Sequence, residues 1–537
     1  SIIMGEYWAG MVIVLMLTGG EGLEDYAEHR AERELHALLT RAPQKARVLR
    51  GRKEVEVKAS EVRAGDKLII RAGELVPVDA EILEGAASFD ESSLTGESLP
   101  APKDVGDMLL SGSVNLDGAI TAKAIHAAAE SQYQQIIKLV KAAGNSQAPF
   151  VRMADRYAIP FTIISFAIAW VVSGDSLRFL EVLVVATPCP LILAAPIAII
   201  SGMSRSAKHG IIIKTGSSLE RLAAARTFAF DKTGTLTRGE LTVERITTFG
   251  KHKRADVLSL AASLERQSNH AQAAAIVTKA EKDKVKFSSI RNVREIAGKG
   301  VVALGKGHEI IVGRLSLLEE YNIAMPTGFA AKDYNQTAAF LAVDGTLAGV
   351  ITFTDELREE SKSTLKRLRA VGIKNFMMIT GDRASTAKDV AKQLNISEVK
   401  AEALPADKIR AIEQASVHPV AFVGDGVNDA PVLTASDVGI ALGARGSSAA
   451  SESADVVIMQ DDLGRVATGV EIAKRTFGIA RQSILVGIGL SVALMLIFST
   501  GKFKPIYGAA IQELVDVVVI FNALRAHGGG KTKTKKR

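Results

Sequence analysis

The sequence predicts a multi-domain α/β protein that also contains membrane helices. Three observations support this fold class. The 537 residues are more than one hydrophobic core usually holds, so several domains are expected. The mean hydropathy is positive, at +0.17, although 23% of the residues are charged, which indicates that apolar and polar segments are separate. Strand and helix patterns then alternate along the polar segments.

Composition and charge exclude several other classes of protein. Hydrophobic residues make up 47% of the chain, which rules out a disordered, collagen-like or low-complexity protein. The single cysteine, Cys189, rules out an internal disulfide framework and a cysteine-rich zinc module. Lysine and arginine total 66 against 59 acidic residues, and part of this excess lies in a basic tail, 531–537, expected near anionic lipid. Aromatic residues are only 5%, so we expect no nucleic-acid partner.

Five apolar segments are candidates for membrane helices. They are Ile2–Leu17, Ala158–Val172, Leu177–Met203, Ile484–Phe498 and Ile506–Leu524. Several fall short of the roughly 20 residues that a spanning helix needs, and Ala158–Val172 taken alone also fits a buried core helix. Short polar links join the second segment to the third and the fourth to the fifth, which predicts two helical hairpins. Because the number of spans is odd, we expect a further helix upstream of Ser1; no signal peptide is legible.

The two long polar stretches between these segments differ in pattern. The first has short β-patterned runs separated by glycine turns, as a small β-rich domain would. These runs are Ala46–Leu49, Glu54–Val57, Lys67–Arg71 and Asp79–Leu83. The second alternates strands with helices, which is typical of a parallel α/β sheet. Its predicted strands are Thr227–Phe230, Phe376–Thr380, Val420–Val423 and Val438–Ala441, and its predicted helices are Arg358–Val371, Ala384–Leu394 and Asp407–Ala415. The looser pattern from about Arg238 to Ile351 predicts an inserted domain.

The densest chemical signal is the string Asp231-Lys232-Thr233-Gly234-Thr235-Leu236-Thr237, directly after a predicted strand. Open α/β sheets bind ligands beyond the carboxyl ends of their strands, so Asp231 can meet a phosphoryl group there. An aspartate can attack phosphorus to give an acyl phosphate, while Lys232 supplies positive charge and Thr233, Gly234 and nearby amides hold phosphate oxygens. Taken alone, Asp-Lys-Thr-Gly also fits an ordinary turn.

Further polar residues follow other predicted strands. One strand leads to Asp425 and Asp429, and their spacing lets both carboxylates supply hard oxygens to Mg²⁺ beside a phosphate. Another strand leads into Thr380 and Asp382. Lys408, after a proline, can neutralise the transferring phosphoryl group from a neighbouring loop. The same end of one sheet therefore collects carboxylates, a threonine and lysines.

In this order, the strand-end aspartate, Thr-Gly-Asp, lysine and Gly-Asp-Gly-x-x-Asp resemble the haloacid dehalogenase superfamily. The heptapeptide 231–237 is a more specific signal, and it resembles the phosphorylation motif of P-type ATPases. This resemblance implies a haloacid dehalogenase-like phosphorylation domain with an inserted α+β nucleotide domain, a β-rich actuator domain and a helical transmembrane bundle. It implies ATP and Mg²⁺ as cofactors. The implied catalytic residues are Asp231, Thr380, Asp382 and Lys408, and the implied Mg²⁺ ligands are Asp231, Thr233, Asp425 and Asp429.

Such a pump should also carry a dephosphorylating loop, and Thr95-Gly96-Glu97-Ser98 lies in the first polar stretch. An acyl phosphate must be shielded from water during half of the cycle and then hydrolysed by an oriented water. We therefore expect Glu97 to act as the general base. The tetrapeptide alone also fits a polar turn, but its position between the first two apolar segments favours the functional interpretation.

The chain resembles the heavy-metal, or type IB, class of these pumps over nearly its whole length. In that class the nucleotide site uses a His-Pro dipeptide, a Gly-x-Gly and a further glycine. His270, Gly298, Gly300 and Gly313 match these positions, whereas Ala271 replaces the proline. We expect His270 to contact the adenine ring. A surface histidine is the alternative, and a lone glycine pair is commonly a turn.

Thr187-Pro188-Cys189-Pro190 lies inside the third apolar segment. A proline within a spanning helix removes a backbone hydrogen bond and exposes carbonyl groups, which makes this point a candidate ion site. The alternative is a kink with a packed thiol. The string resembles the Cys-Pro-Cys, Ser-Pro-Cys or Cys-Pro-His signature of type IB pumps, which implies that Thr187, Pro188 and Cys189 contact the transported ion.

The last apolar segment carries three further polar residues, Gln512, Glu513 and Asp516. Each carboxylate placed in hydrocarbon costs about 3 kcal/mol, so such groups favour a functional interpretation. Glu513 and Asp516 are three residues apart and are expected to share a helix face. The alternative is pairing with Lys502 or Lys504 at the membrane boundary.

One thiolate together with carboxylates and carbonyls suits borderline divalent ions better than monovalent copper, which prefers sulfur-rich coordination. We therefore expect Ni²⁺, Fe²⁺, Co²⁺, Zn²⁺ or Mn²⁺ as the cargo, with a pump for another cation such as potassium as an alternative. Glu6 and Glu24, near the ends of the first apolar segment, fit either an entry path or the membrane boundary.

Together these features predict an ATP-driven exporter of a divalent transition metal. The rival interpretations are a membrane-tethered phosphatase and a non-catalytic metal sensor. The expected domains are a transmembrane helix (1–27), an actuator domain (28–150), two transmembrane helices (151–205), a phosphorylation domain in two parts (206–237 and 353–475), a nucleotide-binding domain (238–352), two transmembrane helices (476–526) and a basic tail (527–537).

We expect an integral protein of a bacterial plasma membrane, with its soluble domains in the cytosol. Lys502 and Lys504 weakly oppose this orientation under the positive-inside rule, but the ATP chemistry outweighs them. The expected partners are the lipid bilayer and the metal ion, with no obligate protein partner.

Overall fold

The computed structural model describes most of the chain, which divides into two compact units. The described residues are 43–51, 53–91, 100–128, 131, 134, 151–172, 174–186, 189–266, 268, 270–296, 299–305, 308–327, 329, 330, 334, 338–382, 384–425, 429–443 and 448–528, with single positions between 7 and 29. Ser1–Ala229, Ser363–Phe376 and Pro405–Arg537 form one unit, and Phe230–Lys362 with Met377–Leu404 form the other.

The first polar stretch folds into two small β-sheets with the strand orders β2-β1-β3-β9-β4-β7 and β6-β5-β8. The strands are β1 (Lys45–Arg50), β2 (Lys53–Lys58), β3 (Lys67–Ile70), β4 (Ala80–Glu84), β5 (Ala87–Asp90), β6 (Ala101–Lys103), β7 (Met108–Leu109), β8 (Val114–Asn115) and β9 (Ile120–Ala124). Alternate side chains, such as Val48, Leu68, Ile82 and Phe89, fill the core. The strands predicted from the sequence are confirmed as β1 to β4.

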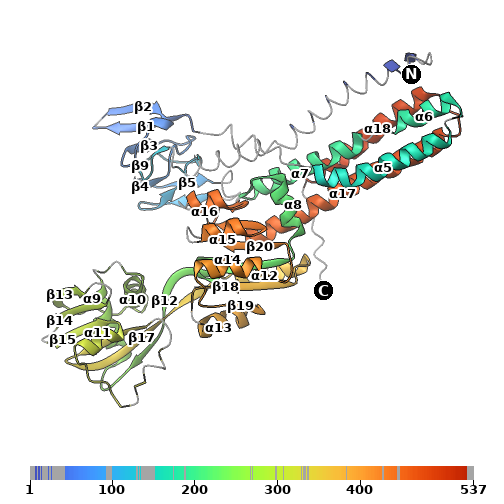
Figure 1. The fold of residues 1–537 in the computed structure, drawn as a ribbon. Helices are drawn as coiled ribbons and strands as arrows, with labels where there is room; N and C mark the ends of the chain where they lie inside the picture. Colours follow the sequence, from blue (N-terminus) through green and yellow to red (C-terminus); the bar gives the residue numbers. More distant parts are fainter. Residues whose placement is uncertain are drawn as a thin grey trace. The chain divides into compact units, whose positions relative to one another are not determined.

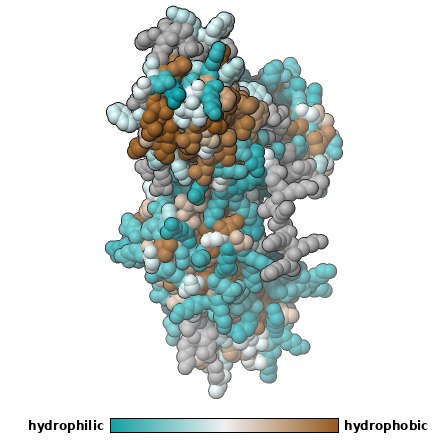
Figure 2. All heavy atoms as spheres, turned by 90° about the vertical axis from the view of Figure 1, so that its right-hand side faces the viewer, coloured by the Kyte–Doolittle hydropathy of each residue, from teal (hydrophilic) through white to brown (hydrophobic). Residues whose placement is uncertain are grey.

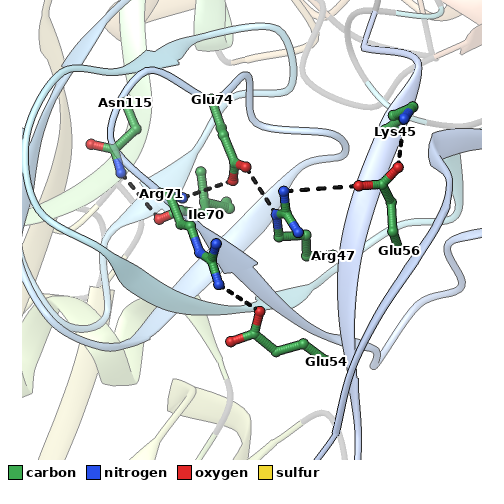
Figure 3. A network of polar contacts seen from close by, with 8 residues as sticks. All are labelled: Lys45, Arg47, Glu54, Glu56, Ile70, Arg71, Glu74 and Asn115. Atoms are coloured by element: carbon green, nitrogen blue, oxygen red, sulfur yellow. Dashed lines mark hydrogen bonds and ion pairs between the residues drawn. The ribbon is translucent and has the colours of Figure 1, made fainter.

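Ion pairs run along the edge of the larger sheet (Figure 3). Arg47 Nε donates to Glu74 Oε1 at 2.9 Å, and Arg71 Nη2 donates to Glu54 Oε2 at 2.8 Å. Strand β2 is exposed along nearly its whole length, and charged side chains on an edge strand oppose pairing with a strand of another molecule. Each exposed pair contributes at most about 1 kcal/mol, so protection of the edge is their main effect.

The apolar segments from Ala158 onward form helices that lie side by side in Figure 1, whereas most of the predicted first segment, Ile2–Leu17, lies outside the described residues. They are α5 (Val151–Val171), α6 (Ser176–Val185), α7 (Cys189–Lys208), α17 (Gly464–Phe498) and α18 (Pro505–Leu524). Helices α17 and α18 are long and apolar enough to cross a bilayer, and α5 contains a shorter apolar stretch. Their outer surface is apolar in the upper part of Figure 2, with Phe166, Trp170, Leu514 and Phe521 exposed.

Both predicted helical hairpins are confirmed as α5–α6 and α17–α18. The prediction of one apolar segment, Leu177–Met203, needs correction because α6 ends at Val185 and α7 begins at Cys189. The sequence has Pro188 at this break, and a proline disfavours helical backbone at the residue before it. Thr187 and Pro188 themselves lie outside the described residues.

Helix α17 begins well before its apolar part, and this extension is held by α12 (Ser361–Ala370). The guanidinium of Arg367 donates to both carboxylate oxygens of Glu471, at 3.0 and 2.9 Å, and to Thr468 Oγ1 at 2.9 Å. Lys474 Nζ donates to the carbonyl of Val371 at 2.6 Å. A bidentate arginine–carboxylate pair fixes orientation as well as distance, so α12 is clamped to the helix that continues into the apolar bundle.

The second polar stretch forms a seven-stranded sheet with the order β10-β22-β21-β20-β11-β18-β19. Its strands are β10 (Ile211–Ile213), β11 (Thr227–Asp231), β18 (Asn375–Ile379), β19 (Glu398–Lys400), β20 (Val420–Gly424), β21 (Val438–Leu442) and β22 (Val456–Ile458). The pairs β18–β19, β20–β21 and β21–β22 are parallel, as predicted, whereas β10 is antiparallel to β22. Strands β11 and β18 contribute residues to both compact units.

Helices follow these strands in the alternating order that the sequence predicts. Besides α12 they are α8 (Gly216–Ala224), α13 (Ala384–Leu394), α14 (Pro405–Glu413), α15 (Ala430–Ala435) and α16 (Ser448–Ser453). The predicted helix Arg358–Val371 starts three residues late, at Ser361, because the backbone N–H of Arg358 donates to the carbonyl of Leu236 and does not enter a helix.

The inserted segment folds around an antiparallel sheet with the order β12-β17-β16-β15-β14-β13. Its strands are β12 (Thr237–Thr248), β13 (Ile290–Ile296), β14 (Gly300–Gly305), β15 (His308–Gly313), β16 (Ala338–Val343) and β17 (Thr346–Leu357), and its helices are α9 (Arg254–Glu265), α10 (Ala271–Lys282) and α11 (Leu315–Glu320). Ile310 and Val312 join one apolar cluster with α9 and α10, whereas Ile311 joins another with α11. The sheet is therefore covered on both faces.

Candidate functional site

Asp231 is the last residue of β11, and its side chain is buried at 6% exposure. The strand before it, including Phe228 and Phe230, is fully buried, so the apolar pattern anchors this carboxyl group at the end of the sheet. The chain then turns through η4 (Lys232–Leu236), where Gly234 has a φ of +73°. Only glycine adopts this left-handed conformation at little cost.

A buried arginine holds the turn after Asp231. Arg358 Nη2 donates to the carbonyl of Gly234 at 2.7 Å, and its Nε donates to the carbonyl of Thr237 at 3.1 Å. The hydroxyl of Ser361 donates to the carbonyl of Leu236 at 2.8 Å. Buried backbone carbonyls need such partners, so the start of α12 fixes the shape of this loop. No motif in the sequence indicates this role of Arg358.

Asp355 connects the two strands that lead into and out of the inserted domain. Thr237 Oγ1 donates to Asp355 Oδ2 at 2.5 Å, and the N–H of Gly239 donates to Oδ1 at 2.9 Å. Burial raises the pKa of Asp355 above its ordinary range, while these hydrogen bonds and the charge of Lys232 act in the opposite direction. Asp355 therefore positions the junction between β12 and β17, a role that no motif in the sequence indicates.

Lys232 and Asp382, which are far apart in the sequence, form an ion pair, and the side chain of Lys232 is 6% exposed. Thr380 follows β18 and is 2% exposed. Its N–H donates to the carbonyl of Lys400 at 2.9 Å, and its hydroxyl accepts from the N–H of Asp382 at 3.1 Å. The structure thus gathers a lysine, a threonine and a carboxylate of the predicted site into one cluster.

Lys408 and Asp429 form a second cluster, with Nζ 2.9 Å from Oδ1 and side-chain exposures of 14% and 4%. A Cβ added to Gly424, the last residue of β20, would lie 2.6 Å from Asp429 Oδ2. Only glycine lets this carboxylate approach the strand end so closely. Asp425 follows Gly424 and is half-buried.

Strands β20, β11 and β18 are consecutive in the strand order. The residues at or just after their carboxyl ends are Asp425, Asp231 and Thr380. The predicted Mg²⁺ ligands offer carboxylate and hydroxyl oxygens, which are ligands that Mg²⁺ takes beside phosphate, so their chemistry fits this ion. Thr233 lies in η4, whereas Glu97 lies outside the described residues.

His270, a residue predicted to bind nucleotide, lies at the start of α10 and close to the end of α9. His270 precedes α10, and its ring lies 3.6 Å from the carboxylate of Glu295 with 68% of its side chain exposed. Glu265, the last residue of α9, is 8% exposed. Burial raises the pKa of Glu265, while His270 and a hydrogen bond from Ser268 lower it. In the sequence Glu265 is visible only as an acid five residues before His270, and its burial is evident only in the structure.

Gly300 and Gly313 pair across β14 and β15. A Cβ added to Gly300 would lie 2.2 Å from the carbonyl oxygen of Val312, and one added to Gly313 would lie 2.4 Å from that of Lys299. The backbones therefore approach closely enough to exclude any side chain, which gives both glycines a packing role as well. Gly298 lies outside the described residues.

The candidate ion site contains a buried polar chain between α17 and α18. Gln512 is fully buried and Asp516 is 7% exposed. Gln512 Nε2 donates to Asp516 Oδ1 at 3.2 Å, and Ser491 Oγ donates to Gln512 Oε1 at 3.4 Å. Glu513 lies three residues before Asp516 in α18, so the two carboxylates are neighbours on the helix surface, but Glu513 is only half-buried. Cys189 is the first residue of α7.

The alternative role for these carboxylates was pairing with the lysines near the membrane boundary. In the described part of the chain, no ion pair joins Glu513 or Asp516 to Lys502 or Lys504. Asp516 is instead bonded to Gln512 of its own helix. The structure therefore shows a hydrogen bond within α18 in place of that pairing.

The chain is similar to several transport proteins. Residues 40–141 match the P-type ATPase actuator domain, and residues 225–437 match haloacid dehalogenase-like hydrolases. A probable cadmium-transporting ATPase of Staphylococcus aureus (strain MRSA252) is 32% identical over 554 residues, which cover 98% of this chain and 76% of that protein. A zinc-transporting ATPase of Bacillus subtilis (strain 168) is 34% identical over 537 residues, which cover 97% of this chain and 84% of that protein.

A probable copper-exporting P-type ATPase V of Mycobacterium tuberculosis (strain ATCC 25618 / H37Rv) is 35% identical over 539 residues, which cover 97% of this chain and 70% of that protein. The crystal structure of a zinc-transporting PIB-type ATPase in the E2.Pi state has a TM-score of 0.66 at 31% identity, and covers 98% of this chain and 88% of that one.

The β-rich domain, the α/β domain with its insertion and the apolar helices thus define a P-type ATPase, an ATP-hydrolysing integral membrane protein. Its relatives narrow the class further. The chain belongs to the type IB, heavy-metal-transporting P-type ATPases.

Proposed function

We propose that this ATPase exports a divalent transition-metal cation from the cytosol across a bacterial plasma membrane, through an aspartyl phosphate at Asp231. The observation that carries the transport step is the hydrogen-bonded pair Gln512–Asp516, buried between apolar helices. A carboxylate in hydrocarbon costs about 3 kcal/mol, and a bound cation offsets that cost. A phosphatase without transport would not need this pair.

In the phosphorylation step, a carboxylate oxygen of Asp231 attacks the γ-phosphorus of ATP, and the bond from that phosphorus to ADP breaks. Lys232, Thr233 and Gly234 hold the phosphate oxygens in this proposal. Lys408 and Thr380 neutralise and bind the transferring group, and Asp382 orients Lys232, its ion-pair partner. Positioning and charge neutralisation of this kind supply most of the catalysis of phosphoryl transfer.

Asp425 and Asp429, with Asp231 and Thr233, would hold Mg²⁺. When bound, this ion neutralises charge on the phosphate oxygens and on the attacking carboxylate. The ion pair of Asp429 with Lys408 supports the assignment, because it places a second cation beside the same carboxylate.

The inserted domain binds the nucleotide in this proposal. His270 and Glu265 contact the adenine, while Gly298, Gly300 and Gly313 let the backbone lie close to it. Glu97 of the actuator domain then orients the water that hydrolyses the acyl phosphate. We also propose the domain boundaries predicted from the sequence.

Thr187, Pro188 and Cys189 supply a thiolate and backbone carbonyls to the transported ion, and Gln512, Glu513 and Asp516 supply oxygen ligands. One sulfur with several oxygens suits borderline divalent ions. The cargo is therefore proposed to be Ni²⁺, Fe²⁺, Co²⁺, Zn²⁺ or Mn²⁺, and zinc is also the cargo named for a relative.

The test is transport into vesicles over a panel of Zn²⁺, Cd²⁺, Ni²⁺, Co²⁺, Fe²⁺, Mn²⁺, Cu⁺ and K⁺. We expect one or more divalent transition metals to stimulate both ATP turnover and accumulation of the ion on the side opposite the nucleotide. Stimulation by K⁺ alone, or turnover that no ion changes, would refute the proposed function.

Coupling between the phosphorylation domain and the bundle is expected to depend on the clamp at Arg367. Arg367→Ala removes the hydrogen bonds to Glu471 and Thr468, so we expect metal-stimulated ATP turnover to fall about tenfold while phosphoenzyme still forms from ATP. Lys366→Ala, an exposed position on the same helix, is the matched control. Equal turnover in the two variants would contradict a coupling role.

A further inference from the structure

One buried acid is not used by the proposed mechanism. Glu181 lies in α6, eight residues before Cys189, and is 2% exposed. Its neighbours Val182 and Val185 belong to the apolar cluster that also contains Met495 and Phe498 of α17. Helix α6 packs against α5, α17 and α18. A carboxyl group so enclosed in the apolar bundle is by default functional.

Two close contacts fix the level of Glu181 along the bundle. Near the link between α17 and α18, a Cβ added to Gly501 would lie 2.5 Å from Arg178 Nε; one added to Gly508 of α18 would lie 2.9 Å from Val185 Cγ1. The step from Arg178 to Val185 in α6 has the same number of residues as the step from Gly501 to Gly508. The segments 178–185 and 501–508 therefore run in the same direction. Arg178, Glu181 and Val185 share one helix face because they are three and four residues apart. Glu181 therefore faces the start of α18, near Pro505.

The inner polar pair lies deeper. Gln512 is one helical turn beyond Gly508 in α18, whereas Glu181 is one turn before Val185 in α6. At 1.5 Å per residue these two turns separate Glu181 from Gln512 by about 12 Å along the bundle. Metal–oxygen bonds are about 2 to 2.6 Å long, so one ion cannot bind Glu181 and Asp516 together. Glu181 marks a separate level, nearer to the links 172–175 and 499–504.

These links lie at the end of the bundle opposite to the phosphorylation domain, because α7 leads into β10 and α17 follows β22. Building on the proposed export, we propose that Glu181 is a second, outer binding station for the transported divalent cation, occupied after the ion leaves the level of Asp516. A carboxylate without a thiolate binds a borderline ion more weakly than a mixed set does. A weak outer site of this kind lowers the barrier that the ion crosses as it leaves the membrane, and it does not hold the ion back.

The test compares Glu181→Gln with Glu181→Asp in vesicles, with Zn²⁺ as the probe. All rates are divided by the amount of protein that inorganic phosphate phosphorylates without metal, so that unfolded molecules do not count. For Glu181→Gln we expect a half-saturating Zn²⁺ concentration for phosphoenzyme formation within about twofold of the parent value, and a Zn²⁺ transport rate about tenfold lower. Glu181→Asp should restore most of the transport.

Three outcomes would overturn the outer station. Transport by Glu181→Gln at the parent rate would show that the group only packs. Equal losses in both variants would assign the effect to side-chain size. A half-saturating Zn²⁺ concentration raised about tenfold or more would place Glu181 at the inner site. If the parent protein itself shows no metal-stimulated phosphoenzyme, the proposed function fails, and this result is distinct from all three.

Discussion

Asp231→Asn is expected to abolish the phosphoenzyme and to lower ATP turnover by at least about a thousandfold, because an amide is far less nucleophilic than a carboxylate. Asparagine has nearly the same shape, so the buried strand β11 and the turn held by Arg358 should be preserved. The measurement is transfer of labelled phosphate from ATP to protein. The bond should be stable in acid and cleaved by hydroxylamine, as expected for an acyl phosphate.

The matched control is Asp389→Asn, which makes the same change at an exposed position of α13. It should leave labelling and turnover unchanged. Turnover by Asp231→Asn near the parent rate would mean that ATP is hydrolysed directly by water. Labelling that survives in this variant would mean that another residue accepts the phosphoryl group.

Much of the fold could be predicted because the determining signals are local. Helix α13 was predicted with both ends correct, since Ala387, Val390, Ala391 and Leu394 repeat at helical spacing and are all buried. The helix after Arg358 was predicted too early. Arg358 has good helix propensity, but its tertiary hydrogen bonds to the loop after Asp231 prevail.

The candidate site was predictable only where a motif spells it out in consecutive residues. Asp231, Thr380 and Asp425 each follow a legible strand, whereas Asp355 gains its role from Thr237, which is 118 residues away. Similarly, only burial separates Glu265 of α9 and Glu181 of α6 from exposed glutamates of the described helices. Burial and long-range partners depend on the packed structure, so single-sequence patterns do not contain them.

The polar residues of α18 show the same limit of prediction from the sequence. The sequence places Gln512, Glu513 and Asp516 within two turns of α18 but does not show which of them faces its neighbours. Packing against α17 buries Gln512 and Asp516; Ser491 of α17 donates to Gln512, which in turn donates to Asp516. Because Glu513 remains half-buried, the structure ranks the two carboxylates and makes their roles separable by mutation.

Asp516→Asn is therefore expected to lower metal-stimulated phosphoenzyme formation from ATP by about a hundredfold or more at fixed metal concentration, since a charged ligand is lost from a low-dielectric site. The isosteric amide still accepts the hydrogen bond from Gln512, so the helix pair should keep its packing. Phosphorylation by inorganic phosphate without metal should persist and shows that the variant is folded.

Glu513→Gln is the matched comparison, because it removes one charge from the same helix, three residues before Asp516. We expect its effect on half-saturating metal to be about threefold or less. Equal losses in the two variants would mean that the ion contacts both carboxylates, so that burial in this structure does not select the ligand. A larger loss in Glu513→Gln would require α18 to rotate when the ion binds, since its present orientation turns Asp516 inward.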